Sequence, residues 1–290
     1  MTEPPRPELP IAVFDSGVGG LTVLHECLVS LPHEDFVYLG DTARFPYGRR
    51  SADELRGFAL ELGELLLAEG AKLLVVACNS AAAAAGALRE GLAGRVGVVS
   101  VVGPESRLAA RATRNGRVGL LATPATVASG AYDRALASEA PAATLESVAA
   151  PELAPMIQAG GEIDALVVDC VERVCAPLRA AAVDTVILGC THYPLVRPIL
   201  QRTLGRGVEI VTSGPAIADE VERELRARGL ERPESRRGSY RFRCSGDPEA
   251  FRRVGTRFLQ LPLGEVRQVE VAPTRRDEAD GASRSRRAAA

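Results

Sequence analysis

Short apolar runs recur along the chain and alternate with segments of helical periodicity. The runs are rich in valine, isoleucine and leucine, as expected for strands buried on both faces of a sheet, and they lie at Ile11–Phe14, Phe36–Leu39, Leu73–Ala77, Val96–Val102, Arg117–Leu121, Leu145–Ala149, Thr185–Gly189 and Val208–Val211. Helical spacing of apolar residues is found at Glu54–Glu69, Ala81–Leu92 and Glu162–Ala182. Strands that alternate with helices predict an α/β fold with doubly wound, mainly parallel sheets.

The spacing of two motifs suggests that this α/β unit occurs twice. One strand ends near Asp15, and Cys78 follows 63 residues later; another ends near Thr123, and Cys190 follows 67 residues later. A chain of 290 residues is also longer than one average domain. We therefore predict two pseudo-symmetric domains with an active site in the cleft between them. The predicted domains are residues 10–102 with 213–271, and residues 103–212.

The two ends of the chain differ from the rest. Residues 1–9 are rich in proline, and residues 272–290 hold mainly arginine, alanine, serine and aspartate without an apolar pattern. We expect both segments to be disordered tails. Before the second tail, Ser239–Cys244, Pro248–Leu259 and Val266–Val271 still have the pattern of folded elements.

Composition limits the kinds of binding partner and the cellular compartment that we expect for this chain. The net charge of −2 gives no electrostatic footprint for nucleic acid or a membrane surface. No apolar stretch is long enough to span a membrane, and the first residues lack a signal-peptide pattern. We therefore expect a cytoplasmic protein whose six cysteines are free thiols. With three histidines and no Cys-x-x-Cys pair, we predict no metal site.

Two of these cysteines stand at positions typical of an active site. Cys78 follows the run Leu73–Ala77, and Cys190 follows the run Thr185–Gly189; small polar residues come next in both cases. Parallel α/β sheets bind ligands outside the carboxyl ends of their strands. Two such thiols indicate a pair of bases that act on opposite faces of one substrate carbon, as a cofactor-free racemase requires.

Lysine usage argues against the cofactor that amino-acid chemistry most often uses. Lys72 is the one lysine among 35 basic residues, and it precedes a predicted strand, away from the binding edge. Pyridoxal phosphate needs a lysine for its Schiff base. We therefore predict no cofactor, so that side chains alone must move the proton.

A free thiol is mostly protonated at neutral pH and needs help to act as a base. Predicted helices begin near Asn79 and near Pro194, directly after the two cysteines, and a helix N-terminus favours a thiolate. His192 lies two residues beyond the second thiol, and Asp15 ends a strand that we expect beside the strand of the first thiol. These two side chains are the candidate proton-handling partners.

Two loops are candidates for holding an anionic substrate. The segment Asp15-Ser16-Gly17-Val18-Gly19-Gly20 lacks the third glycine of a dinucleotide loop and no Gly-Lys-Ser/Thr follows, but its backbone N–H groups suit a carboxylate. The segment Phe45-Pro46-Tyr47-Gly48 predicts a turn that closes over a substrate.

Taken in order, these segments resemble the glutamate racemases of the aspartate/glutamate racemase superfamily. The resemblance extends from about residue 10 to residue 271. Its motifs are Phe14-Asp15-Ser16-Gly17-Val18-Gly19-Gly20-Leu21-Thr22-Val23, Gly40-Asp41-Thr42-Ala43-Arg44-Phe45-Pro46-Tyr47-Gly48, Ala77-Cys78-Asn79-Ser80, Ala122-Thr123-Pro124-Ala125-Thr126, Gly189-Cys190-Thr191-His192-Tyr193-Pro194-Leu195 and Ser245-Gly246-Asp247-Pro248.

The resemblance implies that the chain interconverts L- and D-glutamate without a cofactor and supplies D-glutamate for peptidoglycan. It implies that Cys78 deprotonates D-glutamate with help from Asp15, and that Cys190 deprotonates L-glutamate with help from His192. The residues that it places around the substrate carboxylates and ammonium are Asp15, Ser16, Tyr47, Gly48, Asn79, Ser80, Thr123, Thr126, Thr191 and His192.

The chain departs from the family pattern at three positions. Ser80 stands where the family usually has threonine, and Ala82 where a second hydroxyl residue often follows. Gln158 falls where a glutamate partners the second thiol, so either His192 serves that side alone or the correspondence shifts there. We predict that activity survives this change and is unequal in the two directions.

Three alternatives stay open at this point. A related racemase acting on aspartate would have the same pair of thiols, although the Asp15-Ser16 and Pro46-Tyr47-Gly48 loops favour glutamate. A thiol redox protein would join the two cysteines reversibly, and an amino-acid-binding protein would bind without turnover. A homodimer is compatible with the sequence, but no segment identifies its interface.

Overall fold

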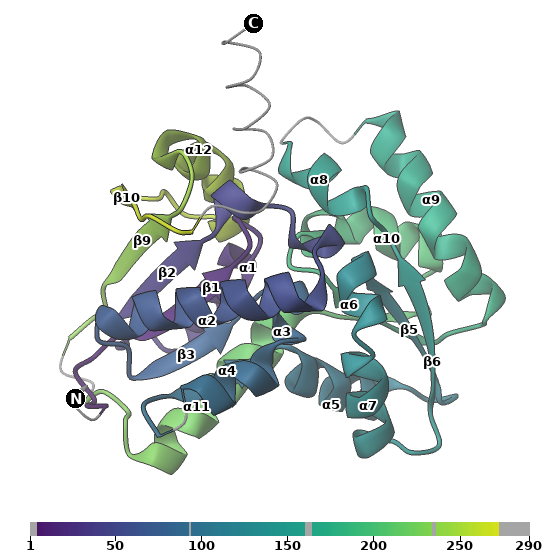
Figure 1. Cartoon of the computed structure of the whole chain (residues 1–290). Coiled ribbons are helices and arrows are strands. Elements are labelled where there is room, and N and C mark those ends of the chain that lie inside the picture. The colour runs from purple at the N-terminus through teal and green to yellow at the C-terminus, as the bar shows by residue number, and fades with distance from the viewer. Residues whose placement is uncertain (1–4, 93, 160–163, 234–235, 273–290) are drawn as a thin grey trace, which may run out of the picture.

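The structure is a computed structural model, and it describes residues 5–92, 94–159, 164–233 and 236–272. Within these ranges the strands form one sheet of six strands and one of four. All neighbouring strands run parallel. Figure 1 shows the two sheets in separate halves of the molecule, each with helices packed on its faces. The predicted doubly wound α/β fold is confirmed.

The larger sheet has the strand order β10-β9-β2-β1-β3-β4. Its central strands β1, β2 and β3 are buried along their whole length, as their continuous apolar runs predict. The strands are β1 Ile11–Asp15, β2 Phe36–Gly40, β3 Leu73–Val76, β4 Gly97–Ser100, β9 Tyr240–Cys244 and β10 Val266–Gln268. The helices of this half are α1 Leu21–Ser30, α2 Ala52–Ala68, α3 Asn79–Ala82, α4 Ala85–Gly91, α11 Ser213–Arg228 and α12 Pro248–Leu259, with the 3₁₀ turns η1 Thr42–Arg44 and η2 Tyr47–Arg49.

The smaller sheet has the strand order β6-β5-β7-β8. The strands are β5 Arg117–Ala122, β6 Thr144–Ala149, β7 Thr185–Gly189 and β8 Glu209–Val211. Its helices are α5 Val102–Ala112, α6 Pro124–Ala128, α7 Ala131–Glu139, α8 Leu153–Gln158, α9 Ala165–Ala180 and α10 Arg197–Leu204, with the 3₁₀ turn η3 Tyr193–Val196.

The two sheets share one connectivity. Numbered within each half, β2-β1-β3-β4 and β6-β5-β7-β8 have the same order of first to fourth strand. Asp15 ends β1 and Thr123 follows β5, whereas Cys78 and Cys190 stand just beyond the two third strands β3 and β7. The internal repeat predicted from the motif spacing is therefore present, and it places both thiols at equivalent strand ends.

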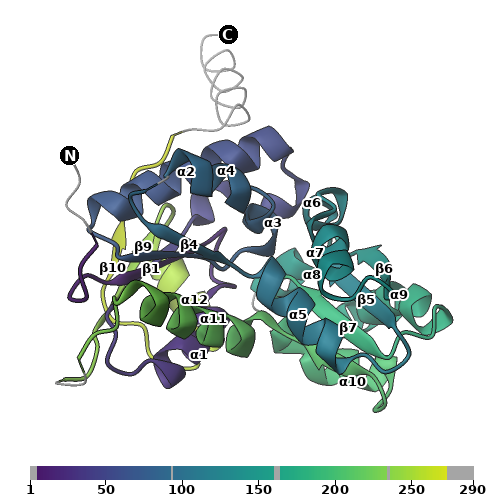
Figure 2. The same ribbon diagram turned by 90° about the horizontal axis from the view of Figure 1, so that it is seen from below.

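The chain passes between the halves twice, from β4 into α5 and from β8 into α11. Helix α11 contacts α1 and β4 of the first half and α5 of the second, and Figure 2 shows it running beside that junction. The predicted domain limits at residues 102–103 and 212–213 fall at these two passages. The limits themselves stay a prediction.

Helix caps explain where two predicted helices begin. Ser51 and Glu54 form a capping box, in which Ser51 Oγ accepts the Glu54 N–H at 3.3 Å and a Glu54 carboxylate oxygen accepts the Ser51 N–H at 2.9 Å. Helix α2 therefore starts at Ala52, two residues before the apolar pattern. Asp247 caps α12, and Pro248 stands at its first position, so this helix has the predicted bounds.

The segments that follow the two cysteines differ from the prediction. We expected a helix to run from the first thiol to Leu92, but it is interrupted between α3 and α4. After Cys190 the chain forms the 3₁₀ turn η3 before α10 begins at Arg197. Neither thiol therefore stands at the start of a long, uninterrupted α-helix.

Part of the expected N-terminal tail is packed on the protein. The Lys72 ammonium, at the edge of the sheet before β3, binds the Pro7 carbonyl and the Leu230 carbonyl at 2.8 Å and Glu34 at 2.5 Å. Residues 5–9 are thus fixed at the end of the sheet opposite the thiols, which corrects the predicted tail there. Ala272, the first residue of the second tail, donates its N–H to Glu61. Residues 1–4 and 273–290 lie outside the described residues.

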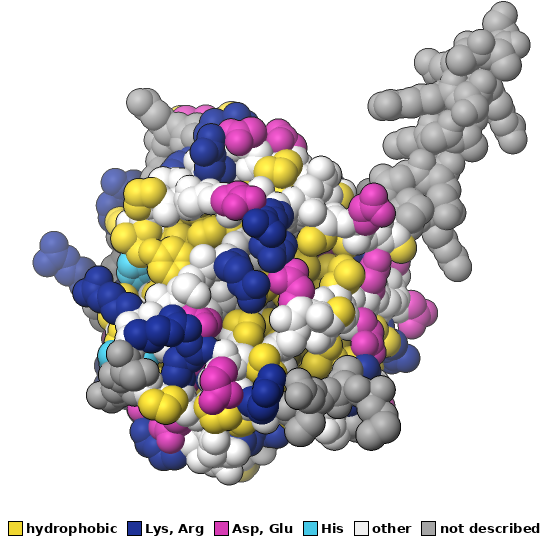
Figure 3. All heavy atoms as spheres, turned by 90° about the vertical axis from the view of Figure 1, so that its left-hand side faces the viewer, with side chains coloured by type: hydrophobic (Ala, Val, Ile, Leu, Met, Phe, Trp, Pro, Cys, Tyr) yellow, Lys and Arg dark blue, Asp and Glu magenta, His cyan; other side chains and the backbone are white. Residues whose placement is uncertain are grey.

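The face at the β10 edge carries side chains of both charges. Figure 3 shows arginines and acidic residues interspersed there with small apolar areas. Among the residues that the structure describes, no helix has both the length and the apolarity needed to cross a membrane.

Candidate active site

A cavity between the two halves is lined by both cysteines. Cys78 reaches it from the end of β3 and Cys190 from the end of β7, and each side chain is less than a tenth exposed. The cavity volume is about 20 Å³. The residues around it come from both sheets: Ser16, Phe45, Pro46, Tyr47, Gly48, Arg49, Cys78, Asn79, Ser80, Thr123, Pro124, Pro151, Ala154, Pro155, Cys190, Thr191 and His192.

The first thiol is buried beside two polar groups. Cys78 Sγ donates to Ser16 Oγ at 3.6 Å. Burial, and next the nearby charge of Asp15, raise the pKa of the Cys78 thiol to about 12. The thiol is therefore protonated near neutral pH, and it needs a base or a nearby cation to ionise.

Asp15 lies behind the cavity wall and connects the two halves. Its carboxylate accepts the Gly17 N–H at 2.8 Å and the Thr191 hydroxyl at 3.0 Å. Complete burial raises the pKa of Asp15 to about 6, although these hydrogen bonds oppose the shift. Asp15 does not itself line the cavity, so its carboxylate reaches a substrate through the side chains that it holds.

The second thiol is paired with a neutral histidine. Cys190 Sγ lies 3.9 Å from His192 Nδ1, and His192 Nε2 lies 2.8 Å from Gln158 Oε1. Because an amide oxygen only accepts, the ring proton stands on Nε2 and leaves the Nδ1 lone pair toward the sulfur. Burial lowers the pKa of His192 to about 3 and raises that of Cys190 well above its usual range. Gln158 thus occupies the partner position that the resemblance indicated.

The glycine loop after β1 serves close packing between the halves. A Cβ at Gly19 would stand 2.3 Å from Thr191 Oγ1 and 2.5 Å from His192 Nδ1. Only a residue without a side chain lets the two halves meet there. The Gly17 N–H is already bound by Asp15, so it is not available to a substrate carboxylate, and the anion-binding role of the rest of the loop stays a prediction.

Three hydroxyl groups form a cluster at the cavity. Ser80 Oγ lies 2.9 Å from Thr123 Oγ1 and 3.4 Å from Thr126 Oγ1, and the two threonine oxygens are 3.0 Å apart. Ser80 and Thr123 line the cavity, whereas Thr126 lies behind them. The cluster supplies hydroxyl donors from both halves of the molecule.

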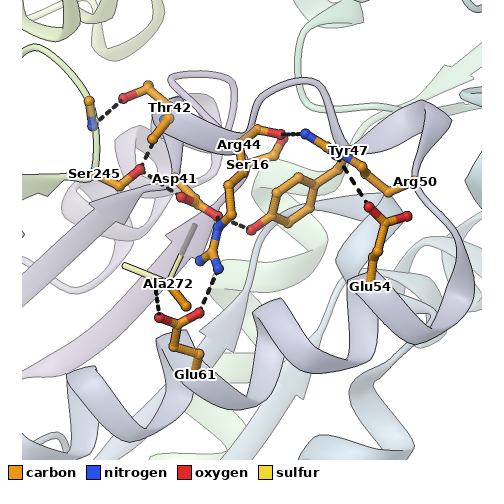
Figure 4. A network of polar contacts seen from close by, with 12 residues as sticks. Ser16, Asp41, Thr42, Arg44, Tyr47, Arg50, Glu54, Glu61, Ser245 and Ala272 are labelled. Carbon is orange, nitrogen blue, oxygen red and sulfur yellow. Dashed lines mark hydrogen bonds and ion pairs between the residues drawn. The ribbon is translucent and has the colours of Figure 1, made fainter. Parts of the chain in front are cut away.

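The loop with Tyr47 and Gly48 is held by a buried network, which Figure 4 shows. The Tyr47 hydroxyl donates to Asp41, and the Arg44 guanidinium binds the same carboxylate at 2.6 Å. Ser245 Oγ donates to the other Asp41 oxygen at 2.6 Å. The Tyr47 hydroxyl is therefore committed to this network, so the loop has its ring and its backbone N–H groups left to offer a substrate.

The structure also brings in two residues that the sequence patterns do not single out. Asn79 Nδ2 donates to Glu105 Oε2 at 3.2 Å and to the Tyr132 hydroxyl at 2.7 Å. Both partners are fully buried and belong to helices α5 and α7 of the second half. One glutamate within a polar helical segment gives no signal of burial, because only the packing between the halves encloses it.

The other side chains that could bind a metal ion do not gather at one place within the described residues. Cys27, Cys170, Cys175 and Cys244 are buried and unpaired. Across the described ranges, no group of three or more His, Cys, Asp or Glu side chains is placed to hold a metal ion.

A repeated parallel α/β unit, with a thiol at the same strand end of each half and a shared cavity, defines the class of α/β racemases. The chain matches the Asp/Glu/Hydantoin racemase family over residues 22–221. It is 45% identical over 260 residues to a glutamate racemase from Acidothermus cellulolyticus. This match covers 89% of this chain and 98% of the relative.

Solved structures agree with this. A glutamate racemase from Bacillus anthracis superposes with a TM-score of 0.87 at 36% identity, over 92% of this chain and 99% of the other. A glutamate racemase from Francisella tularensis, determined in complex with D-glutamate, gives a TM-score of 0.85 at 29% identity, over 91% and 98% of the two chains. The chain belongs to this racemase family, and within it to the glutamate racemases.

Proposed function

We propose that this enzyme interconverts L- and D-glutamate by proton transfer between the substrate α-carbon and two cysteines, and that it supplies D-glutamate for peptidoglycan from the cytoplasmic pool. The observation that supports the proposal is the single cavity that is lined by Cys78 from one half and by Cys190 from the other. The relatives described above, one of them bound to D-glutamate, support glutamate as the substrate.

In the direction from L to D, the Cys190 thiolate removes the α-hydrogen of L-glutamate. Its own proton has first passed to His192 Nδ1, which lies 3.9 Å from the sulfur. The Cys78 thiol then delivers its proton to the opposite face of the carbanion. The product is D-glutamate, with a thiolate left at Cys78 and a protonated thiol at Cys190.

The reverse direction uses the same groups with exchanged roles. The Cys78 thiolate removes the α-hydrogen of D-glutamate, and the Cys190 thiol reprotonates the carbanion. Asp15 assists the first thiol, because its pKa of about 6 lets it exchange a proton near neutral pH. Between turnovers the two sulfurs recover their protonation states through these partners.

Substrate binding is expected to favour the thiolates. The α-ammonium of glutamate brings a positive charge between two buried sulfurs, and an opposite charge nearby lowers a thiol pKa. The Ser80 and Thr123 hydroxyl groups and the backbone at Gly48 are the groups for the carboxylates. A cavity of about 20 Å³ holds roughly one water molecule, so we expect the two halves to separate when glutamate enters.

The test follows the α-hydrogen in deuterium oxide, without pyridoxal phosphate. With L-glutamate as substrate, we expect loss of optical rotation and deuterium in the D-glutamate formed early, while the remaining L-glutamate keeps its hydrogen. Cys78→Ala and Cys190→Ala should each abolish racemisation, whereas Cys170→Ala, away from the cavity, should keep it. Near-normal turnover by either active-site variant contradicts the two-thiol mechanism.

The same assay separates the alternatives. An aspartate racemase would exchange the α-hydrogen of L-aspartate at least as fast as that of L-glutamate. A redox protein would gain activity when Cys78 and Cys190 are oxidised, whereas a two-thiol racemase loses it and recovers with a reductant.

A further inference from the structure

A buried carboxylate stands next to the cavity without a cationic partner. Glu105 is fully buried in α5, and its oxygens accept hydrogen bonds from Ser213 Oγ, the Tyr132 hydroxyl and Asn79 Nδ2. All three donors are neutral, and within the described part of the chain no arginine, lysine or histidine forms an ion pair with Glu105. Because an unpaired buried charge is costly, Glu105 is a candidate for a functional role.

The contacts of Glu105 fix the orientation of the Asn79 amide. The Asn79 amide nitrogen Nδ2 donates to Glu105 Oε2 and to the Tyr132 hydroxyl, which lie side by side. The amide oxygen Oδ1 is buried and has no partner. Asn79 lines the cavity directly after Cys78. The atom of this side chain that has no partner is therefore an acceptor, and it belongs to the residue next to the reacting Cys78.

An acceptor at this place selects the charge of the group that it meets. A carbonyl oxygen attracts an ammonium group and repels a carboxylate. The hydrogen bonds that the Asn79 amide donates to Glu105 and Tyr132 strengthen this acceptor, because hydrogen bonds in a chain polarise one another. If the amide turned over, its NH₂ group would face the substrate ammonium and repel it.

We propose that Glu105, with Tyr132, is a positioning residue that holds the Asn79 amide so that Oδ1 receives the α-ammonium group of the amino-acid substrate. The inference rests on the proposed function, since it names the substrate group that this wall of the site recognises. Through Ser213, the first residue of α11, the same carboxylate also binds one of the two passages between the halves.

The conservative variant Glu105→Gln provides a matched control. Its amide oxygen can accept from both Asn79 and Tyr132, and its NH₂ group can donate to Ser213 Oγ. Glu105→Leu has a similar size but removes the acceptor. Tyr132→Phe removes the second acceptor of the Asn79 amide and leaves Glu105 in place.

The experiment compares two ligands that differ in the ammonium group. Binding of DL-glutamate and of glutarate, which has both carboxylates but no ammonium, is measured by calorimetry on the full chain; the racemic mixture prevents net turnover. For Glu105→Leu we expect the affinity for glutamate to fall about tenfold or more, with the affinity for glutarate changed less than about threefold. Glu105→Gln should bind both ligands nearly as the unchanged chain does.

The outcomes separate this inference from the proposed function. Equal weakening of both ligands in Glu105→Leu, or no weakening of either, overturns the positioning role. If Glu105→Leu does not fold, Tyr132→Phe decides: a loss confined to glutamate supports the role, and an equal change for both ligands overturns it. If the unchanged chain does not exchange the α-hydrogen of glutamate in deuterium oxide, the proposed function itself fails.

Discussion

His192 Nε2 and Gln158 Oε1 are 2.8 Å apart, so an uncharged amide stands against the imidazole where the family pattern has a glutamate. The amide oxygen accepts the ring N–H and fixes the tautomer that directs Nδ1 to Cys190. A glutamine therefore keeps the orientation of the histidine and gives up the stabilisation of its charged form.

This contact bears on the prediction that racemisation is unequal in the two directions. L- and D-glutamate have equal free energies in water, so kcat/KM must be equal for both at any pH. The weaker proton partner at His192 can therefore make kcat and KM differ between the two directions, whereas kcat/KM stays the same for both. We therefore expect the inequality that Gln158 causes to appear as a difference between kcat for L-glutamate and kcat for D-glutamate.

The first prediction concerns the charge of His192. Burial lowers its pKa to about 3, so its imidazole should stay neutral, with the proton on Nε2, between about pH 5 and 8. Gln158→Glu places a carboxylate against the ring and should raise this pKa. Nitrogen NMR of the imidazoles measures both states, and the chain has only three histidines. Titration of the His192 signal near pH 6 in the unchanged chain contradicts the neutral, buried histidine.

The second prediction concerns the packing at Gly19. Gly19→Ala forces a Cβ against Thr191 and His192, so we expect kcat to fall about tenfold or more and the free energy of unfolding to fall by about 1–3 kcal/mol. Gly57→Ala is the control, because its added Cβ meets nothing within 4 Å. In the middle of α2 it should stabilise the chain by about 0.5–1 kcal/mol with unchanged kcat. Urea unfolding and initial rates decide, and normal turnover by Gly19→Ala would falsify the close approach.

The third prediction concerns the loop over the cavity. Tyr47→Phe removes the hydroxyl that binds Asp41 and should loosen the loop, so that KM for glutamate rises several-fold while kcat falls less. Tyr240→Phe is the matched control, since this tyrosine is exposed on β9. Steady-state kinetics of both variants provide the measurement. A loss confined to kcat indicates instead that Tyr47 acts in the chemical step.

Much of the fold is predictable from local patterns. The runs that contain Ile11 and Val186 are apolar because they are buried on both faces, and the strand-end position of each thiol follows from the same runs. The cap at Asp247 likewise depends on neighbouring residues alone. Such features need no knowledge of what lies across the molecule.

What the sequence does not reveal depends on contacts between distant segments. The alanine run after Cys78 predicts one helix, yet the chain interrupts it between Ala82 and Ala85, just after the turn in which Ser80 meets Thr123 of the other half. The sequence does not show that Gly19 lies against His192, because that contact joins the two halves of the molecule. Glu105 is an ordinary helical glutamate until three donors from three segments enclose it.

The last prediction is a pH dependence of the free energy of unfolding that follows from the burial of Glu105. Burial raises the pKa of Glu105 to about 7 from 4.5, so the folded chain binds a proton that the unfolded chain has released between these values. Stability from this group is complete below about pH 4.5 and is lost as the pH rises through 7, by up to roughly 3 kcal/mol. Glu105→Gln cannot ionise, so its free energy of unfolding relative to the unchanged chain should rise by that amount between pH 5 and 8. Asp15 and His192 titrate in both chains and cancel in the difference. Urea unfolding of both chains at the two pH values measures it, and parallel pH profiles show that Glu105 ionises at its ordinary pKa.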